Sequence, residues 1–152
     1  MIAILAVFCS IYSISASAQD TVLFSQHDPA MNAAIEKARA SLPAFWEKFG
    51  SPGPGEEGFS LKVAISDGDA TEHFWCGSIE GNAEKSSCAI ANEPLHVRSV
   101  KYLQRVDVDP NRISDWMYRL KGKIKGGETI RAIIPMLSQK DAEYYRSLLA
   151  DP

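Results

Sequence analysis

Residues 113–131, ISDWMYRLKGKIKGGETIR, bring an acid, two aromatic residues, a glycine pair and an arginine together in one short stretch. The part from Ile113 to Tyr118 is typical of extended chain, and GKIKGG at 122–127 is typical of a hairpin or loop return. After Thr129 the apolar residues recur at helical intervals, although Pro135 argues against a long regular helix. We therefore expect the corner of a sheet here, followed by a helical segment.

The chain before this corner predicts several strands. Apolar residues at 59–65 alternate with polar or small ones, which indicates a half-buried strand. The sequence DGDA at 67–70 predicts a turn, and the segments 71–80 and 85–94 are expected to run out and back as a hairpin. A further strand region is expected within residues 100–108, before an Asp-Pro-Asn turn.

An N-terminal helix is predicted from Asp28 and Pro29, because a capping acid followed by proline in the first turn is typical of a helix start. Apolar residues then recur at helical spacing as far as Leu42. Pro43 disfavours helical geometry at the preceding residue, so we expect a break or kink there.

A last helix is expected over residues 139–150, capped by Ser138. A helix, a run of strands and further helical segments predict an α+β fold, with an antiparallel sheet of about four to five strands in a single domain at 29–150. The length of 152 residues and the composition, 45% hydrophobic and 23% charged, fit one globular domain. The net charge of -3 argues against nucleic acid or an anionic membrane as partner, because both require a basic patch.

The first eighteen residues, MIAILAVFCSIYSISASA, carry no charged side chain and end in small residues. They predict a signal peptide at 1–18, cleaved between Ala18 and Gln19, and a short N-terminal lead at 19–28. The alternative is an uncleaved anchor, but the apolar core is short for a span of about 20 residues. We therefore expect a periplasmic or secreted protein, with no stable membrane insertion after cleavage.

The predicted signal peptide determines which cysteines remain in the mature protein. Cys9 leaves with the signal peptide, and Cys76 and Cys88 remain. An even pair in an oxidising compartment predicts a disulfide bond, whereas two buried thiols are the alternative. If Glu80 faces Glu84 across a three-residue turn, Cys76 falls directly opposite Cys88, within bridging distance. The pattern alone does not fix this register.

No complete catalytic or metal site is visible in the sequence. The histidines are far apart and no zinc-type cysteine spacing is present, so we expect no metal and no cofactor. His73 and Cys76 fall on opposite faces of a strand, and no serine lies in a Gly-x-Ser-x-Gly elbow. The sequence therefore favours a protein without enzymatic activity and leaves an enzyme open as an alternative.

A set of recognition-type residues remains, because Trp, Tyr and Arg combine a large contact area with a polar group. These binding candidates are Glu72, His73, Trp75, Asp115, Trp116, Tyr118 and Arg131. For the two tryptophans we favour core packing over recognition, since an indole closes a small core and reaches a hydrogen bond. A pairing of Asp115 with Arg131, pinning the sheet corner to the next helix, is an architectural alternative.

Four segments carry a resemblance to a known family: EHFW at 72–75, ANEP at 91–94, ISDWMY at 113–118 and GKIKGGETIRAI at 122–133. In this order they resemble the bacterial family called domain of unknown function 2314, the YegJ-like proteins. The resemblance implies a compact α+β domain, and no established activity, substrate or cofactor. The two later cysteines stand where that family is expected to have small residues, which fits an exported version that gained a bridge.

Three functions are consistent with these features. The leading hypothesis is an exported, non-enzymatic binding or interaction domain whose partner is an unknown protein or small molecule. The second is a small hydrolase-like enzyme that uses His73 or Asp115 as general base. The third is a purely structural stability module, in which the polar residues only brace the sheet corner.

Overall fold

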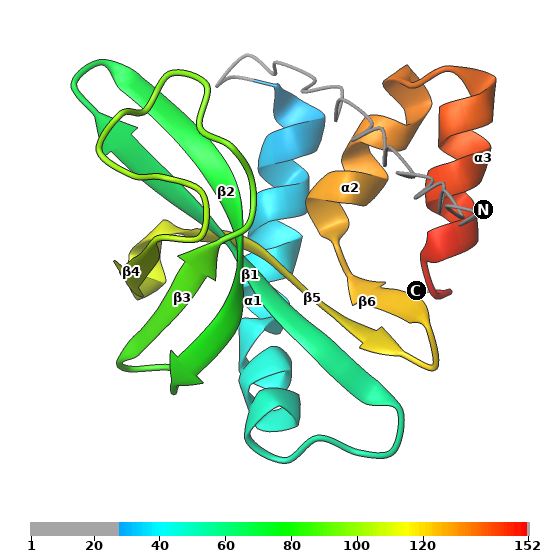
Figure 1. The fold of residues 1–152 in the computed structure, drawn as a ribbon. Helices are drawn as coiled ribbons and strands as arrows, with labels where there is room; N and C mark the ends of the chain where they lie inside the picture. Colours follow the sequence, from blue (N-terminus) through cyan, green and yellow to red (C-terminus); the bar gives the residue numbers. More distant parts are fainter. Residues whose placement is uncertain (1–27, 152) are drawn as a thin grey trace, which may run out of the picture.

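The computed structural model describes residues 28–151, and the predicted signal peptide, its cleavage site and nearly all of the N-terminal lead lie outside the described residues. Figure 1 shows an α+β arrangement, which confirms the predicted fold class. The helical elements are α1 (Pro29–Gly50), η1 (Pro110–Arg112), α2 (Glu128–Ile133), η2 (Ile134–Met136) and α3 (Gln139–Leu148). The strands are β1 (Glu56–Asp67), β2 (Ala70–Gly81), β3 (Ser86–Ile90), β4 (Arg105–Val108), β5 (Ile113–Leu120) and β6 (Lys123–Gly126).

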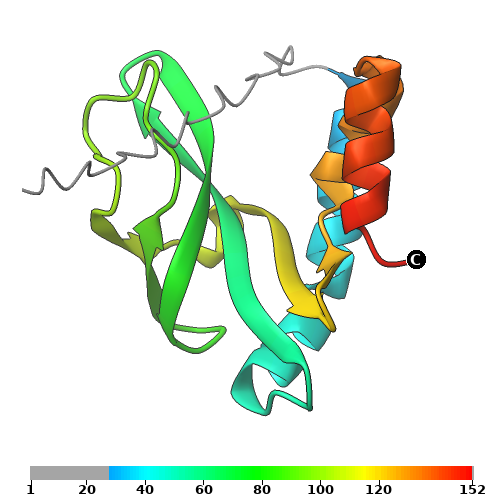
Figure 2. The same cartoon turned by 45° about the vertical axis from the view of Figure 1, so that its right-hand side comes forward.

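The six strands form one antiparallel sheet in the order β4-β3-β2-β1-β5-β6, which is more strands than the sequence predicts. In a flat sheet, four strand spacings would separate β4 from β5, a distance of about 19 Å. Only the short η1 turn joins Val108 to Ile113, and even a fully extended connection of that length reaches roughly 17 Å. The sheet therefore curls, and both residues lie in the same core. Figure 2 shows the helices gathered on one side of the curled sheet.

Helix α1 begins as predicted, with the Asp28 carboxylate accepting a hydrogen bond from the backbone N–H of Met31 at 2.9 Å. Of the break or kink expected at Leu42, the break does not occur, because the helix continues through Pro43. Ala38 before the proline and Phe45 after it are both buried in the same core, so packing on either side holds the helical path. Within residues 28–151 no helix is both long enough and apolar enough to cross a membrane.

The β2–β3 hairpin contains the Cys76–Cys88 disulfide, with a Cα–Cα distance of 5.5 Å. The register left open by the sequence differs from the one with Glu80 opposite Glu84, since Cys76 pairs with Ile90 rather than lying directly opposite Cys88. The register shifts between Gly77 and Glu80, where Ser78 adopts a positive φ of 47°. This bulge adds an extra residue to β2, and the two cysteines meet on the diagonal.

The C-terminal half matches its prediction in part. Strand β5, the β6 return and the Ser138 cap of α3 are present, and Pro135 falls in the 3-10 turn η2 that ends the short α2. The expected strand within 100–108 is confined to β4, and residues 100–104 form a turn instead. A second, smaller core joins β6 to the C-terminal helices through Ile124, Ile134, Ala142 and Leu149.

Replacing both Cys76 and Cys88 by Ser is expected to lower the free energy of unfolding by about 3 kcal/mol, because the bond closes a ring across 12 positions of the unfolded chain. Denaturant unfolding measures the difference. Wild-type protein treated with a reductant is the control and should also lose stability, although less than the double variant, which places two serine hydroxyls in the buried core. Equal stability of the oxidised wild type and the double variant would contradict this role for the bond.

Candidate functional site

The Asp115 side chain is completely buried and accepts four hydrogen bonds. Its oxygens receive the backbone N–H groups of Trp116 at 2.8 Å, Glu128 at 3.2 Å and Thr129 at 2.8 Å. The Thr129 hydroxyl donates the fourth bond, at 2.6 Å. Glu128 and Thr129 are the first residues of α2, whose N-cap position is a glycine without a capping side chain. Asp115 on β5 therefore caps α2 from outside the helix.

Burial raises the pKa of Asp115 above its ordinary value, against the opposing effects of the Thr129 and Trp116 hydrogen bonds and of the Lys62 charge. Because its oxygens are turned toward backbone and threonine donors, the carboxylate acts as a structural acceptor. This arrangement leaves Asp115 poorly placed for proton transfer to a ligand.

The glycine pair of the opening stretch is explained by two separate requirements. A Cβ atom on Gly126 would lie 2.4 Å from the Trp116 carbonyl oxygen and 2.6 Å from its ring, so only glycine allows this close approach. Gly127 has a φ of 66°, the left-handed conformation from which α2 starts. Together they let the chain leave β6 and enter α2 directly over Trp116.

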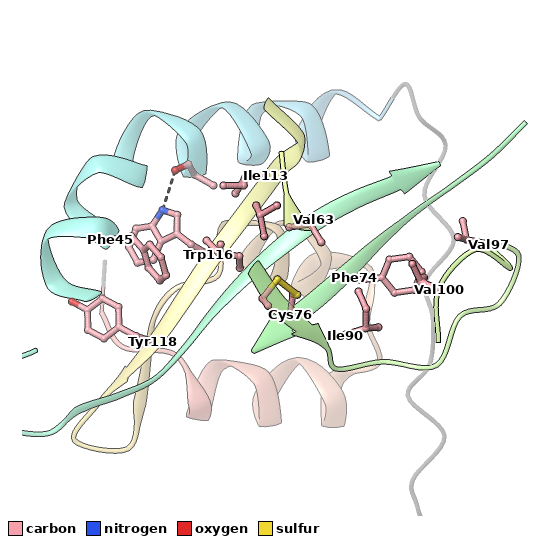
Figure 3. Close-up of a cluster of buried hydrophobic side chains, with 14 residues drawn as sticks. Phe45, Val63, Phe74, Cys76, Ile90, Val97, Val100, Ile113, Trp116 and Tyr118 are labelled. Atoms are coloured by element: carbon pink, nitrogen blue, oxygen red, sulfur yellow. Dashed lines mark hydrogen bonds between the residues drawn. A yellow bond between two sulfur atoms is a disulfide. The ribbon is translucent and has the colours of Figure 1, made fainter. Parts of the chain in front are cut away.

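Trp116 and Tyr118 belong to the main core rather than to a surface. Both are 8% exposed, and their rings stack with centroids 6.0 Å apart. The Trp116 Nε1–H donates to the Ala38 carbonyl of α1 at 3.0 Å, the dashed line in Figure 3. Phe45 of α1 packs against the same indole at 5.6 Å. Trp116 thus attaches α1 to the sheet, and Tyr118 stacks beside its ring.

A groove of about 800 Å³ lies over one face of β1 and β2. Its floor contains Lys62 and Ala64 of β1, which pair with Trp75 and His73 of β2 respectively. Side chains of directly paired residues project to the same face of a sheet, so these four form one patch. The small Ala64 side chain leaves open space beside His73.

Two helices and a loop form the walls of the groove. Met31 and Ile35 line it from the first turns of α1, and Ile130 and Ile133 line it from α2. All four are only partly buried, so they present apolar surface to the hollow. The charged lining residues beyond the floor are Arg39, Arg112, Glu72, Glu93 and His96.

Lys62 is the half-buried cation of the groove floor. Its Nζ donates to the Thr129 hydroxyl at 3.0 Å and lies 5.5 Å from the centroid of the Trp75 ring. Because the Thr129 proton goes to Asp115, a chain of hydrogen bonds runs from Lys62 through Thr129 to Asp115. Burial lowers the pKa of Lys62, and the Asp115 charge opposes that shift.

His73 stands exposed on the groove floor, with its Nδ1 2.8 Å from the Ser114 hydroxyl. Ser114 donates its single proton to the Lys62 carbonyl oxygen at 3.2 Å, so Nδ1 of His73 must be the donor in the first bond. The neutral ring therefore carries its proton on Nδ1 and has an unprotonated Nε2. Desolvation lowers the pKa of His73, and the Lys62 and Arg112 charges lower it further.

Glu72 stabilises the loop that forms one groove wall. Its carboxylate accepts hydrogen bonds from the backbone N–H groups of Leu95, His96 and Val97. These bonds lower the pKa of Glu72 against the effect of its partial burial. The carboxylate is thus engaged with the loop.

The structure separates the predicted binding candidates into two groups. Glu72, His73 and Trp75 line the groove, whereas Asp115, Trp116 and Tyr118 are buried supports. Arg131 donates to the Ala150 carbonyl at 2.8 Å and not to Asp115, so the suggested Asp115–Arg131 pairing is replaced by the Asp115–Thr129 contact.

Sequence reasoning missed Lys62, Ser114 and Thr129. For Lys62 a signal was present, because it lies between two core residues of an alternating strand and so projects to the opposite face. No feature of the sequence around Lys62 indicates that α2 covers that face. Among the described residues no group of three or more His, Cys, Asp or Glu side chains is placed to hold a metal ion.

Asp115→Asn is expected to lower the free energy of unfolding by about 3 kcal/mol, because an amide cannot accept all the donors aimed at this buried position. Thermal or denaturant unfolding measures the loss. Asp107→Asn, at an exposed position of β4, is the matched control and should change stability little. Similar small changes in both variants would show that Asp115 does not hold β5 to α2.

Comparison with known proteins places the chain in a family. The model of the family described as "Uncharacterized protein conserved in bacteria (DUF2314)" matches residues 28–149. "Uncharacterized protein YegJ" of Escherichia coli K12 is 32% identical over 86% of this chain and 84% of its own length. A "Putative ankyrin repeat protein" of Neisseria meningitidis serogroup B is 29% identical over 80% of this chain and 52% of its own length. No solved structure gives a significant match. The chain belongs to the DUF2314 family.

Proposed function

We propose that the protein is an exported, non-enzymatic binding domain that holds a small-molecule ligand in the groove over β1 and β2. The observation that carries this proposal is Lys62, a half-buried cation at the floor of a hollow of about 800 Å³. Small-molecule sites are typically hollows of this size, mostly apolar, with a few polar groups that fix the ligand.

The groove favours a small molecule over a protein partner because it is concave and its polar groups converge on the floor. Trp75 gives it a large, partly exposed aromatic surface, and His73 adds a hydrogen-bonding group on the same face. Glu72 acts on the loop wall, while Asp115, Trp116, Tyr118 and Arg131 hold the elements that frame the groove.

Export is supported by two independent features. The first eighteen residues have the composition of a signal peptide. The pairing of Cys76 with Cys88 requires an oxidising compartment to persist in most bacteria. Both features favour the periplasm or the cell exterior as the compartment in which the protein binds its ligand.

Trp75→Ala is expected to weaken ligand binding about tenfold, since it removes the aromatic surface of the groove. A mixed library of anionic, neutral and cationic fragments, screened by saturation-transfer NMR against the mature full-length protein, supplies the probes. Tyr102→Ala removes another partly exposed aromatic ring that does not line the groove, and it should leave binding unchanged. If no fragment binds, or if Trp75→Ala retains full affinity for those that do, the proposal fails.

A second candidate function, a small hydrolase, is favoured by the tautomer of His73. Its Nδ1 is committed to Ser114, which leaves the Nε2 lone pair free to accept a proton from water. The nearby Lys62 ammonium would stabilise the oxyanion formed when that water attacks a carbonyl. Asp115 is a poor general base by comparison because four donors occupy its oxygens.

For this second function, His73→Gln is expected to abolish hydrolysis of p-nitrophenyl acetate, whereas His96→Gln should retain it. Both histidines line the groove and are exposed, which makes them matched. A base works only when deprotonated, and the pKa of His73 is lowered, so wild-type activity should fall at a lower pH than that at which an ordinary histidine becomes protonated. Equal rates in the two variants would rule out His73 as the base.

A further inference from the structure

We propose that the ligand of the groove is an amphipathic carboxylate, bound through its carboxylate by Lys62 and through an aliphatic body by the apolar walls. This inference rests on the proposed function, since it assumes that the groove holds a small molecule. It assigns to Lys62 the role of the ligand's charged contact.

Lys62 is incompletely satisfied without an anion. An ammonium group has three N–H donors. Within the described residues, the Lys62 ammonium makes its hydrogen bond to the neutral Thr129 hydroxyl. The Trp75 ring face is a second, weaker partner at 5.5 Å. Among the described residues no carboxylate lies within 4 Å of its Nζ. A cation drawn out of water in this way is stabilised when a ligand carboxylate binds beside it.

The charge of the groove floor also favours an anion. Arg112 lies near His73, and Arg39 lines the same hollow from α1. Of the two lining acids, Glu72 already accepts three backbone N–H groups of the loop, and Glu93 is exposed. Desolvation and the nearby Lys62 and Arg112 charges lower the pKa of His73, so the floor around this ring is positively charged. Burial lowers the pKa of Lys62, while the Asp115 charge opposes that shift.

A carboxylate fits better than a phosphate. Phosphate sites usually present several free backbone N–H groups or an uncommitted arginine fork. Here the first N–H groups of α2 are bonded to Asp115. The Arg112 guanidinium is partly committed, because it donates to the Ala64 carbonyl and to the Ser66 hydroxyl. Of the other two cations, Arg39 is exposed to solvent and Lys62 is half-buried close to a buried acid. The desolvated contact is therefore a single lysine, which suits one negative charge.

The walls define the other end of the ligand. Met31 and Ile35 are one helical turn apart on α1, so their side chains stand above one another, and Ile130 and Ile133 do the same on α2. These four partly exposed side chains make two apolar ridges that line the same hollow as Lys62. An aliphatic chain lying between them would gain affinity by about fourfold for each methylene buried.

The test uses decanoate as the probe, with decanamide as its uncharged counterpart, titrated into the mature full-length protein by calorimetry. Decanoate is expected to bind at least tenfold more tightly than decanamide, and hexanoate more weakly than decanoate. Lys62→Met should remove the preference for the carboxylate, and Lys62→Arg should retain part of it. Lys140→Met, at an exposed lysine of α3, is the control and should leave the preference intact.

A second measurement needs no variant, so the inference stays testable if Lys62→Met does not fold. NOEs from the decanoate methylenes to the methyl groups of Ile130 and Ile133 are expected in the wild-type complex. Equal affinity for decanoate and decanamide, or decanoate NOEs to other regions only, would overturn the inference. If neutral fragments bind in the groove while carboxylates do not, the groove is still a small-molecule site and only the carboxylate inference fails. If nothing binds, the proposed function and the carboxylate inference both fail.

Discussion

The buried carboxylate of Asp115 is the contact on which the geometry of this protein depends. It belongs to a central strand, yet its oxygens bind the first two N–H groups of α2 and the Thr129 hydroxyl. Without it, a six-residue helix with a glycine N-cap would have unsatisfied donors in a buried place. Because α2 forms one wall of the groove and Thr129 contacts Lys62, the same carboxylate fixes the wall and orients the cation.

Much of the fold was predictable because its signals are local. Apolar residues alternate with polar or small ones over residues 59–65 of β1, and Asp28 and Ser138 cap their helices as expected. What failed depends on contacts between distant residues. Pro43 remains in a helix because Ala38 and Phe45 are anchored in one core. Cys76 pairs with Ile90 because the β2–β3 turn comes after Gly81, which pairs with Ser86. The curl of the sheet follows from the short η1 connection, which can be recognised only once the strand order is known.

The candidate site was only partly predictable for a related reason. Composition drew attention to the aromatic and charged residues of the opening stretch, but Trp116 and Tyr118 are core residues, and Trp116 joins α1 to the sheet. The residues that line the hollow come from β1, β2 and two helices, and their proximity is set by sheet register and by the placement of α2. A strand lysine such as Lys62 normally projects into solvent, so its partial burial is visible only in the folded chain.

Amide hydrogen exchange of α2, in the wild type and in Asp115→Asn, tests most directly whether the Asp115 carboxylate holds α2 in place. If Asp115 holds the helix in place, the Thr129 amide of the wild type should exchange only through global unfolding. In the folded variant the α2 amides should exchange far faster. The amides of β2 and β3 in that variant should keep their protection relative to its global stability. Equal protection of α2 in both proteins would contradict the central role given to this carboxylate.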